Sequence, residues 1–273
     1  MENKPIRMVV CDLDGTLLNG FSKITEETRR TIRDLRKQGI LFGICSGRSA
    51  VALKDLVRVW GIENDVDFVL GFNGGMKWDP KTGEIEEWLT FPGKKVPEMA
   101  ALFKGFPVWF AQYWGKVTLS TKDHPISRQF ARRNHLQFQK STIEEMAKHD
   151  TGKFMAVGMP WTISKFLKTH PRKTEDYRLI RSGPFLIEIV NPALSKLEGV
   201  KHIAREYDIP LDQVMTFGND NNDIEMLEGT VGVAMANALP QVKEAVTYIA
   251  GRNTKNGVAR FLQQHVLHQP EKS

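Results

Sequence analysis

The sequence predicts an α/β fold whose parallel sheet is interrupted by an α+β insertion. Several short runs carry apolar residues on consecutive positions, as expected of strands buried on both faces. These runs lie at residues 6–11, 40–45, 67–72, 214–217 and 231–235. Helical patterns between successive runs give right-handed βαβ units with parallel strands. From about residue 80 to 189, short alternating stretches mix with short helical ones, which indicates an antiparallel sheet with helices.

The first part of the parallel sheet is expected to contain three strands and two helices. The first helix is predicted to begin at Thr25, where acidic residues follow in the first turn, and to end at Gly39. A second helix is expected at about residues 50–60. The third strand ends at an Asn73-Gly74-Gly75 turn, and a hairpin is expected from Trp78 to Trp88.

The insertion is expected to form a domain of its own. We assign residues 80–189 to this α+β domain, and residues 1–79 and 190–273 to the core. The insertion is predicted to contain strands at 108–113 and 116–121 and helices around 142–148 and 163–169.

The core is expected to resume with a helix that opens at Ser195-Lys196. Two more buried strands follow at 214–217 and 231–235. A helix with Pro240 near its first turn and a last helix at 258–267 complete the predicted core.

Composition is that of a globular protein. The 273 residues are 41% hydrophobic and 26% charged, and no apolar stretch approaches the ~20 residues of a membrane span. The N-terminus runs directly into the first strand, so no secretory signal and no membrane association are expected. Cys11 and Cys45 are the only cysteines, and both fall on predicted buried strands. We therefore expect inert thiols, no disulfide and a cytoplasmic protein.

Positive charge is concentrated in the insertion. The net charge is +6, and residues 81–188 hold 18 Lys and Arg against 11 Asp and Glu. A basic segment can attract anionic ligands, including nucleic acid. The basic residues are spread out, however, with no aromatic-basic repeat and no helix-turn-helix or zinc spacing. We therefore expect a small phosphorylated metabolite or solvated charge, and no nucleic-acid partner.

Two carboxylates, Asp12 and Asp14, follow directly on the first apolar run. Ligands of open parallel sheets bind at the carboxyl ends of the strands. Two acids at such a place are unfavourable unless a cation neutralises them or their pKa values are pushed apart. Gly15 then permits a sharp turn. An acidic helix cap would also explain the bare pair, so the two carboxylates alone leave both interpretations open.

Other strand ends carry complementary groups. Ser46-Gly47-Arg48 follows the second strand, and the helix that Ser46 would cap could present N–H groups to a phosphate. Gly218–Asp223 follows the strand at 214–217, although a polar turn would also suit that sequence. Lys196 adds a cation, and by itself it would be interpreted as a solvated lysine. Together these groups supply the nucleophile, metal ligands, cations and proton source of phosphoryl transfer.

The motifs resemble those of the haloacid dehalogenase superfamily, in its Cof-type branch with a large α+β cap. The resemblance covers nearly the whole chain, through these segments: Asp12-Leu13-Asp14-Gly15-Thr16, Ser46-Gly47-Arg48, Asn73-Gly74, Ser195-Lys196, Gly218–Asp223 and Gly232–Ala238. It implies a doubly wound parallel-sheet core and a cap that sets substrate specificity.

The resemblance also implies roles for individual residues. Asp12 would be the nucleophile that becomes phosphorylated, and Asp14 the general acid and then the base. The resemblance implies phosphate contacts from Leu13, Ser46, Gly47, Lys196 and Asn222. Mg²⁺ would be the cofactor, with ligands from Asp12, the Asp14 carbonyl, Asn219 and Asp223.

Two positions depart from the family pattern. The fourth motif usually begins Gly-Asp, and here Asn219 follows Gly218, with Asp220 next. Mg²⁺ would lose an anionic ligand if Asn219 takes that position, and Asp220 is the rival ligand. Leu197 follows Lys196 where the family usually has glycine, which affects local packing more than the charge of the lysine.

The function predicted from these residues is a Mg²⁺-dependent phosphatase of small phosphorylated metabolites, sugar phosphates above all. A sugar phosphomutase would share the nucleophile but return the phosphoryl group to the sugar. A non-catalytic phospholigand-binding regulator would be expected to lose Asp12 or Asp14, and both are present. The physiological substrate and the oligomeric state do not follow from the sequence.

Overall fold

The computed structural model describes residues 4–134 and 136–267. The chain divides into two compact units. The core unit comprises the residues up to Glu86 together with those from Ser195 onward, and the inserted unit comprises Glu87–Leu194. No helix within the described residues combines the length and the apolar character needed to cross a bilayer.

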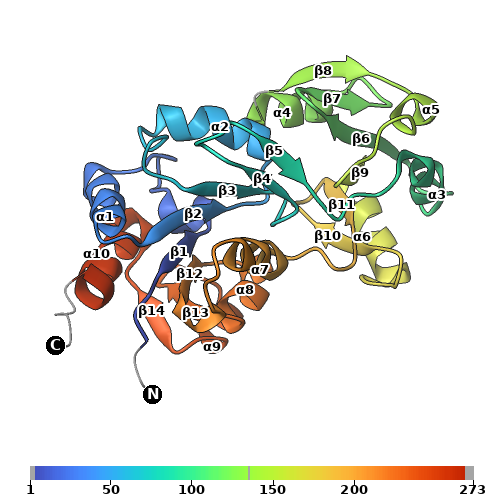
Figure 1. Cartoon of the computed structure of the whole chain (residues 1–273). Helices are drawn as coiled ribbons and strands as arrows, with labels where there is room; N and C mark the ends of the chain where they lie inside the picture. The colour runs from blue at the N-terminus through green and yellow to red at the C-terminus, as the bar shows by residue number, and fades with distance from the viewer. Residues whose placement is uncertain (1–3, 135, 268–273) are drawn as a thin grey trace. The chain divides into compact units, whose positions relative to one another are not determined.

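The core unit is built on one eight-stranded sheet, in the order β14-β13-β12-β1-β2-β3-β4-β5 (Figure 1). The strands are β1 (Met8–Cys11), β2 (Leu41–Cys45), β3 (Phe68–Gly71), β4 (Met76–Trp78), β5 (Ile85–Glu87), β12 (Val214–Gly218), β13 (Val231–Met235) and β14 (Tyr248–Ala250). All pairs from β14 to β3 are parallel, and β4 runs antiparallel to β3. Strands β4 and β5, from the predicted hairpin, extend this sheet.

The sheet is doubly wound about β1, which confirms the predicted fold class. The chain proceeds from β1 to β2 and β3 on one side, and from β12 to β13 and β14 on the other. Right-handed crossovers therefore place the helices that connect strands of the first half and those that connect strands of the second half on opposite faces. The helices are α1 (Glu26–Lys37), α2 (Ala50–Val59), α7 (Lys196–Glu206), α8 (Ile224–Glu228), α9 (Pro240–Glu244) and α10 (Gly257–Leu262). Helix α10 packs on α1, and α7 packs on α8.

The reversal of direction at β1 fixes where the candidate site lies. Cys11 is in register with Phe217 of β12 on one side and with Ile44 of β2 on the other. The next residue along β1 is Asp12. Open α/β sheets bind their ligands outside the carboxyl ends of the strands at such a reversal. The residues after β1, β2 and β12 therefore meet at one edge of the sheet.

The inserted unit contains a six-stranded sheet in the order β10-β11-β9-β6-β7-β8. Its strands are β6 (Val108–Trp114), β7 (Val117–Ser120), β8 (Gln137–Lys140), β9 (Phe154–Gly158), β10 (Arg178–Arg181) and β11 (Leu186–Val190). Its helices are α3 (Val96–Ala101), α4 (Pro125–Arg133), α5 (Ile143–Met146) and α6 (Pro160–Thr169). The pairing is antiparallel as expected, except that β7 and β8 are parallel.

Both faces of this second sheet are packed. Trp109 and Ala111 belong to an apolar cluster on one face, together with Met155. The intervening Phe110 packs on the other face, against a larger cluster that includes Phe154 and residues of α3, α5 and α6. The period-two alternation of the aromatic strand β6 thus divides its side chains between two cores, so the inserted unit has a hydrophobic core of its own.

Gly43 is a position where the core sheet tolerates no side chain. It lies on β2 directly opposite Phe68, and a Cβ atom at this position would overlap the buried Phe68 ring. We expect Gly43→Ala to lower the free energy of unfolding by ~1–3 kcal/mol, the usual effect of overpacking a core. Urea titration measures it. Gly20→Ala is the control, because its added Cβ would lie 3.5 Å from the nearest atom. Equal stability of both variants would contradict the prediction.

Candidate active site

A buried lysine shared by two carboxylates forms the centre of the site. Lys196 is the first residue of α7, and its side chain is 0% exposed. Its Nζ donates to Asp12 Oδ1 and to Asp223 Oδ1, each at 2.6 Å. Burial excludes the alternative that Lys196 is an ordinary solvated residue of a first helical turn. The structure therefore brings together residues from the ends of β1 and β12 and from the start of α7.

The charges of this cluster do not cancel. Burial raises the pKa of Asp12 to about 7, opposed by the nearby Lys196 ammonium and reinforced by the Asp223 carboxylate. Burial alone would lower the pKa of Lys196, but the charges of Asp12 and Asp223 outweigh it and raise that pKa. With every group ionised, one ammonium faces two carboxylates, so the cluster carries one negative charge. A second cation beside Asp12 would offset that charge.

Asp223 orders the loop that follows β12. While its Oδ1 accepts from Lys196, its Oδ2 accepts from the backbone N–H groups of Asn219, at 2.8 Å, and Asp220, at 3.0 Å. A Cβ on Gly218 would lie 2.5 Å from the Asp223 side chain, so only glycine fits there. Both carboxylate oxygens of Asp223 thus accept hydrogen bonds from the protein. Asp223 therefore supports the site by holding Lys196 and the loop backbone.

The Asn219 side chain lies beside three oxygen atoms of the segment that follows β1. One terminal atom of the Asn219 amide lies 3.3 Å from Asp12 Oδ2, 2.9 Å from the Asp14 carbonyl oxygen and 2.7 Å from Thr16 Oγ1. If that atom is nitrogen, it donates to these acceptors. If it is oxygen, it accepts from the Thr16 hydroxyl and faces two further oxygens, an arrangement that a cation would stabilise.

With the Asn219 amide oxygen turned toward them, these groups would suit Mg²⁺. Neighbouring ligands of an octahedral Mg²⁺, with its 2.0–2.1 Å bonds, lie about 2.9 Å apart. The separations of the Asn219 amide from the Asp14 carbonyl and from Asp12 Oδ2, 2.9 and 3.3 Å, are of this size. No group of three or more His, Cys, Asp and Glu residues is arranged for a metal in the described part of the chain. The candidate set instead combines one carboxylate, one carbonyl and one amide oxygen.

The side chain of Asp220, the rival ligand, forms its hydrogen bonds within the loop after β12. Its side chain is exposed, its Oδ1 accepts from the backbone N–H of Asn221 at 2.6 Å, and it forms a reciprocal capping box with Asp223. The Asn219 side chain, and not that of Asp220, is therefore the one directed at Asp12.

The turn after β1 is shaped to admit Asn219. Gly15 has a φ of +86°, and a Cβ there would lie 2.8 Å from Asn219 Nδ2. The Gly15 carbonyl accepts from Asn237 Nδ2 at 2.7 Å. The roles of Thr16 and Asn237 were not predicted. Both residues lie inside the motifs quoted above, and that position is the signal that could have found them.

The loop after β2 carries a buried hydroxyl, that of Ser46. Ser46 is 2% exposed, and its Oγ accepts from the backbone N–H of Arg48 at 3.3 Å. Asn73, in the loop after β3, donates its N–H to the Ser46 carbonyl, and its Oδ1 accepts from Asn222 Nδ2 at 3.0 Å. Gly47 leaves room for this amide, since a Cβ there would lie 3.3 Å from Asn73 Oδ1. Asn73 therefore links the loops that carry Ser46 and Asn222.

Asp14 is held by Arg48, a residue for which no role was predicted. Its two carboxylate oxygens accept from Arg48 Nε at 3.0 Å and from Arg48 Nη2 at 2.7 Å. The Asp14 side chain is 55% exposed, in contrast to the buried Asp12. The two carboxylates of the first motif thus have different environments, one paired inside the protein and one at its surface.

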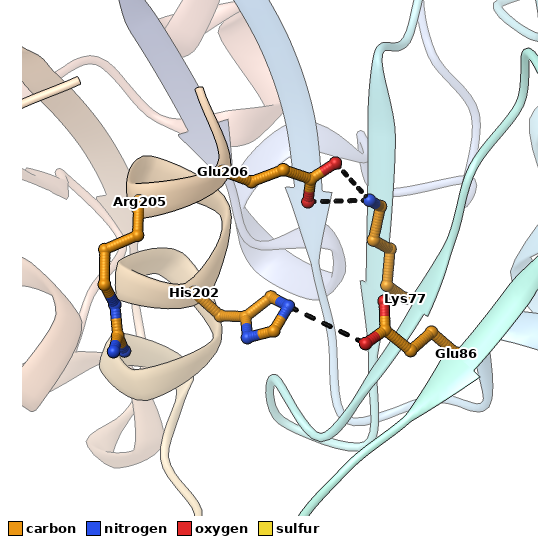
Figure 2. A pocket seen from close by; sticks show the side chains of 5 residues that line it. All are labelled: Lys77, Glu86, His202, Arg205 and Glu206. Atoms are coloured by element: carbon orange, nitrogen blue, oxygen red, sulfur yellow. Dashed lines mark hydrogen bonds and ion pairs between the residues drawn. The ribbon is translucent and has the colours of Figure 1, made fainter. Parts of the chain in front are cut away.

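The helix that presents Lys196 is also held at its other end. Lys77 of β4 donates to both carboxylate oxygens of Glu206, at 2.6 and 2.7 Å (Figure 2). These two residues line a hollow of about 490 Å³ together with Glu86, His202 and Arg205, none of which belongs to the candidate site. The hollow is lined by charges of both signs, and its ion pair fixes the last turn of α7 to the sheet.

The two cysteines are buried, unpaired thiols, as predicted. Cys11 ends β1 and Cys45 ends β2, the strand beside it. Burial raises the pKa of Cys45 to about 12 and also raises that of Cys11. Neither thiol is suited to act as a nucleophile near neutral pH.

Known proteins resemble this chain in sequence and in fold over almost their whole length. A family model described as haloacid dehalogenase-like hydrolase matches residues 9–262. The Bacillus subtilis protein named "Putative phosphatase YxeH" is 28% identical, over 96% of this chain and 98% of its own. The 5-amino-6-(5-phospho-D-ribitylamino)uracil phosphatase YcsE of Bacillus subtilis is 25% identical, over 97% and 98%. The crystal structure of a haloacid dehalogenase-like hydrolase from Bacteroides thetaiotaomicron superimposes with a TM-score of 0.83 at 23% identity, over 95% and 99%.

The raised pKa of Asp12 predicts how stability depends on pH without metal. Between its usual value of 3.8 and about 7, Asp12 binds a proton in the folded protein but not in the unfolded chain. The free energy of unfolding should therefore fall as pH rises through this window. Denaturant unfolding in a chelator should show this fall, and Asp12→Asn should reduce it. Asp212→Asn, at an exposed ion pair with Lys4, should retain the wild-type slope. Parallel pH profiles of the wild type and Asp12→Asn would refute the assignment.

Proposed function

Because this chain belongs to the haloacid dehalogenase-like hydrolases, we propose that it is a Mg²⁺-dependent phosphatase of small phosphorylated metabolites. The observation that carries the proposal is the environment of Asp12. One of its oxygens accepts from buried Lys196, and the other lies 3.3 Å from the Asn219 amide. A carboxylate that contacts an ammonium on one side and possible metal ligands on the other is suited to attack phosphorus.

The reaction would proceed through an aspartyl-phosphate. Asp12 forms a bond from a carboxylate oxygen to phosphorus, and the bond from phosphorus to the leaving oxygen breaks. Asp14 gives its proton to the departing alcohol and then takes one from a water molecule. That water attacks the phosphorus, the Asp12–phosphorus bond breaks, and inorganic phosphate is released. Lys196 offsets the negative charge beside the phosphorylated Asp12.

Mg²⁺ would be held by Asp12, the Asp14 carbonyl and Asn219. When bound, it would neutralise charge on the phosphoryl oxygens. The separations of these oxygens and the uncancelled negative charge of the cluster support this assignment. Asp223 would act indirectly, because Lys196 and two backbone N–H groups occupy its oxygens.

The phosphoryl oxygens of the substrate would be bound by the loops after β1 and β2. We assign them to the Ser46 hydroxyl, the backbone N–H groups of Leu13 and Gly47, Lys196, and the Asn222 amide. Support comes from the burial of Ser46 and from the Asn222–Asn73 hydrogen bond, which joins the loop after β12 to that after β3.

The substrates are proposed to be phosphorylated sugars or sugar alcohols. The named substrate of the relative YcsE carries a 5-phospho-D-ribityl group, which is a phosphorylated sugar alcohol. The inserted unit is proposed to select among them, since none of the residues assigned to the chemistry lies within Glu87–Leu194.

Replacement of the nucleophile tests the function. Asp12→Asn should abolish phosphate release, because an amide is a poor nucleophile toward phosphorus. Phosphate release should be measured with Mg²⁺ across a panel of phosphorylated sugars and cofactors, and repeated after metal removal. The control is Asp34→Asn, a surface change on α1 that should leave turnover unchanged. Turnover of Asp12→Asn within about tenfold of wild type, a barrier change of ~1.4 kcal/mol, would eliminate the covalent mechanism.

The identity of the fourth-motif ligand can be tested with two substitutions. Asn219→Asp would place a second carboxylate beside Asp12, where it repels without metal and binds with it, so Mg²⁺ affinity should rise roughly tenfold. Asp220→Asn should change that affinity little, because Asp220 is engaged within its own loop. Calorimetric Mg²⁺ titration of both variants makes the comparison. A large loss of affinity in Asp220→Asn alone would show that Asp220 is the ligand.

A further inference from the structure

We propose that Arg48 is a phosphate-recognition residue and that Asp14 occupies its guanidinium until the phosphate of the substrate displaces it. This inference rests on the proposed phosphatase function, and it adds a role for a residue outside that assignment. It makes the release of Asp14 depend on the arrival of a phosphate group.

The geometry of the pair is that of a guanidinium bound to an oxyanion. Arg48 donates through Nε and Nη2 to the two oxygens of Asp14, at 3.0 and 2.7 Å. The same fork of donors fits two oxygens of a phosphate, which carries more negative charge than a carboxylate. In the described residues, Asp14 is the one side chain with which Arg48 forms an ion pair.

The backbone of Arg48 is fixed at the loop assigned to phosphate binding. Its N–H donates to Ser46 Oγ at 3.3 Å, and its carbonyl accepts from the Phe72 N–H at 2.8 Å. The Arg48 side chain is 24% exposed, so the guanidinium is only partly open to solvent. The Arg48 backbone thus contacts Ser46, and its guanidinium contacts Asp14, which is two residues from Asp12. These two contacts are the reason that we assign Arg48 to the proposed phosphate site.

The partnership also restricts Asp14. While both of its oxygens accept from Arg48, neither is directed toward a leaving group. When phosphate takes the guanidinium, the exposed Asp14 side chain becomes free to turn toward the leaving oxygen. In this exchange, the phosphate of the substrate replaces the Asp14 carboxylate at the Arg48 guanidinium. It therefore predicts competition between Asp14 and phosphate that can be measured without turnover.

A double-mutant cycle on phosphate affinity tests this competition. The dissociation constant of inorganic phosphate is measured calorimetrically at saturating Mg²⁺ for the wild type, Arg48→Ala, Asp14→Asn and the double variant. Arg48→Ala should weaken binding roughly 10–100-fold, the usual value of hydrogen bonds to a charged group. Asp14→Asn should tighten binding by about threefold or more when Arg48 is present, and by much less in the Arg48→Ala background.

Arg48→Lys keeps the charge without the fork, so its phosphate affinity should fall between those of the wild type and Arg48→Ala. The matched control is the exposed Arg128–Asp123 pair, which has the same forked geometry, with both bonds at 2.6 Å. Asp123→Asn should leave phosphate affinity unchanged. Thermal unfolding of every variant verifies that it is folded.

Three results would overturn the inference. Equal tightening by Asp14→Asn in both backgrounds would mean that Asp14 only repels phosphate through its charge. Unchanged affinity in Arg48→Ala would mean that Arg48 does not bind phosphate. If the wild type hydrolyses phosphate esters, either of these two results refutes this inference and leaves the phosphatase function standing. A wild type that neither hydrolyses phosphate esters nor binds inorganic phosphate would refute the phosphatase function as well.

Discussion

The structure of the site depends on one buried ammonium. Lys196 must be paired, because an uncompensated charge inside a protein is strongly destabilising. Its two partners lie at the end of β1 and in the loop after β12, and Lys196 itself begins α7. The burial of one lysine thus couples the positions of three segments that are far apart in the sequence. Any local shift of one carboxylate would leave the lysine underpaired, so the cluster itself keeps the site rigid.

The amide of Asn219 is compatible with this charge balance. With a carboxylate in its place, the metal-free cluster would hold three acids against one lysine, and the new acid would lie near Asp12 Oδ2. The amide keeps an oxygen available while avoiding that repulsion. It can also donate to Asp12 and to the Asp14 carbonyl, which would stabilise the loops before a metal binds. As the proposed ligand, the Asn219 amide would cause less repulsion in the site without metal and would offer less charge to the metal.

Much of the core could be predicted because its signals are local. Two apolar runs, one before Asp12 and one that ends at Cys45, have the pattern of buried strands. Both form strands of the central sheet. The carboxyl ends of neighbouring parallel strands meet, which brings Asp12, Ser46 and the loop after β12 together. The burial of Lys196 could not be predicted in this way, because a lysine in a first helical turn is usually solvated.

Partnerships between distant side chains also lay beyond the sequence pattern. Periodicity states which face a residue occupies but not which side chain it meets there. The Arg48–Asp14 pair and the Asn222–Asn73 bond each join loops at different strand ends. The hairpin predicted from Trp78 to Trp88 is a similar case. A hairpin pattern does not state whether its strands join an existing sheet, and β4 and β5 do.

The position of the insertion explains how one chain can combine fixed chemistry with a separate second unit. The chain leaves the core after the edge strands β4 and β5, and it returns just before α7. The central pairing of β1 with β2 and β12 therefore does not depend on the inserted residues. The inserted unit has its own sheet with an apolar cluster on each face, so it has a hydrophobic core made of its own residues. Substitutions within that unit can then alter it without disturbing the pairing that holds Asp12 beside Lys196.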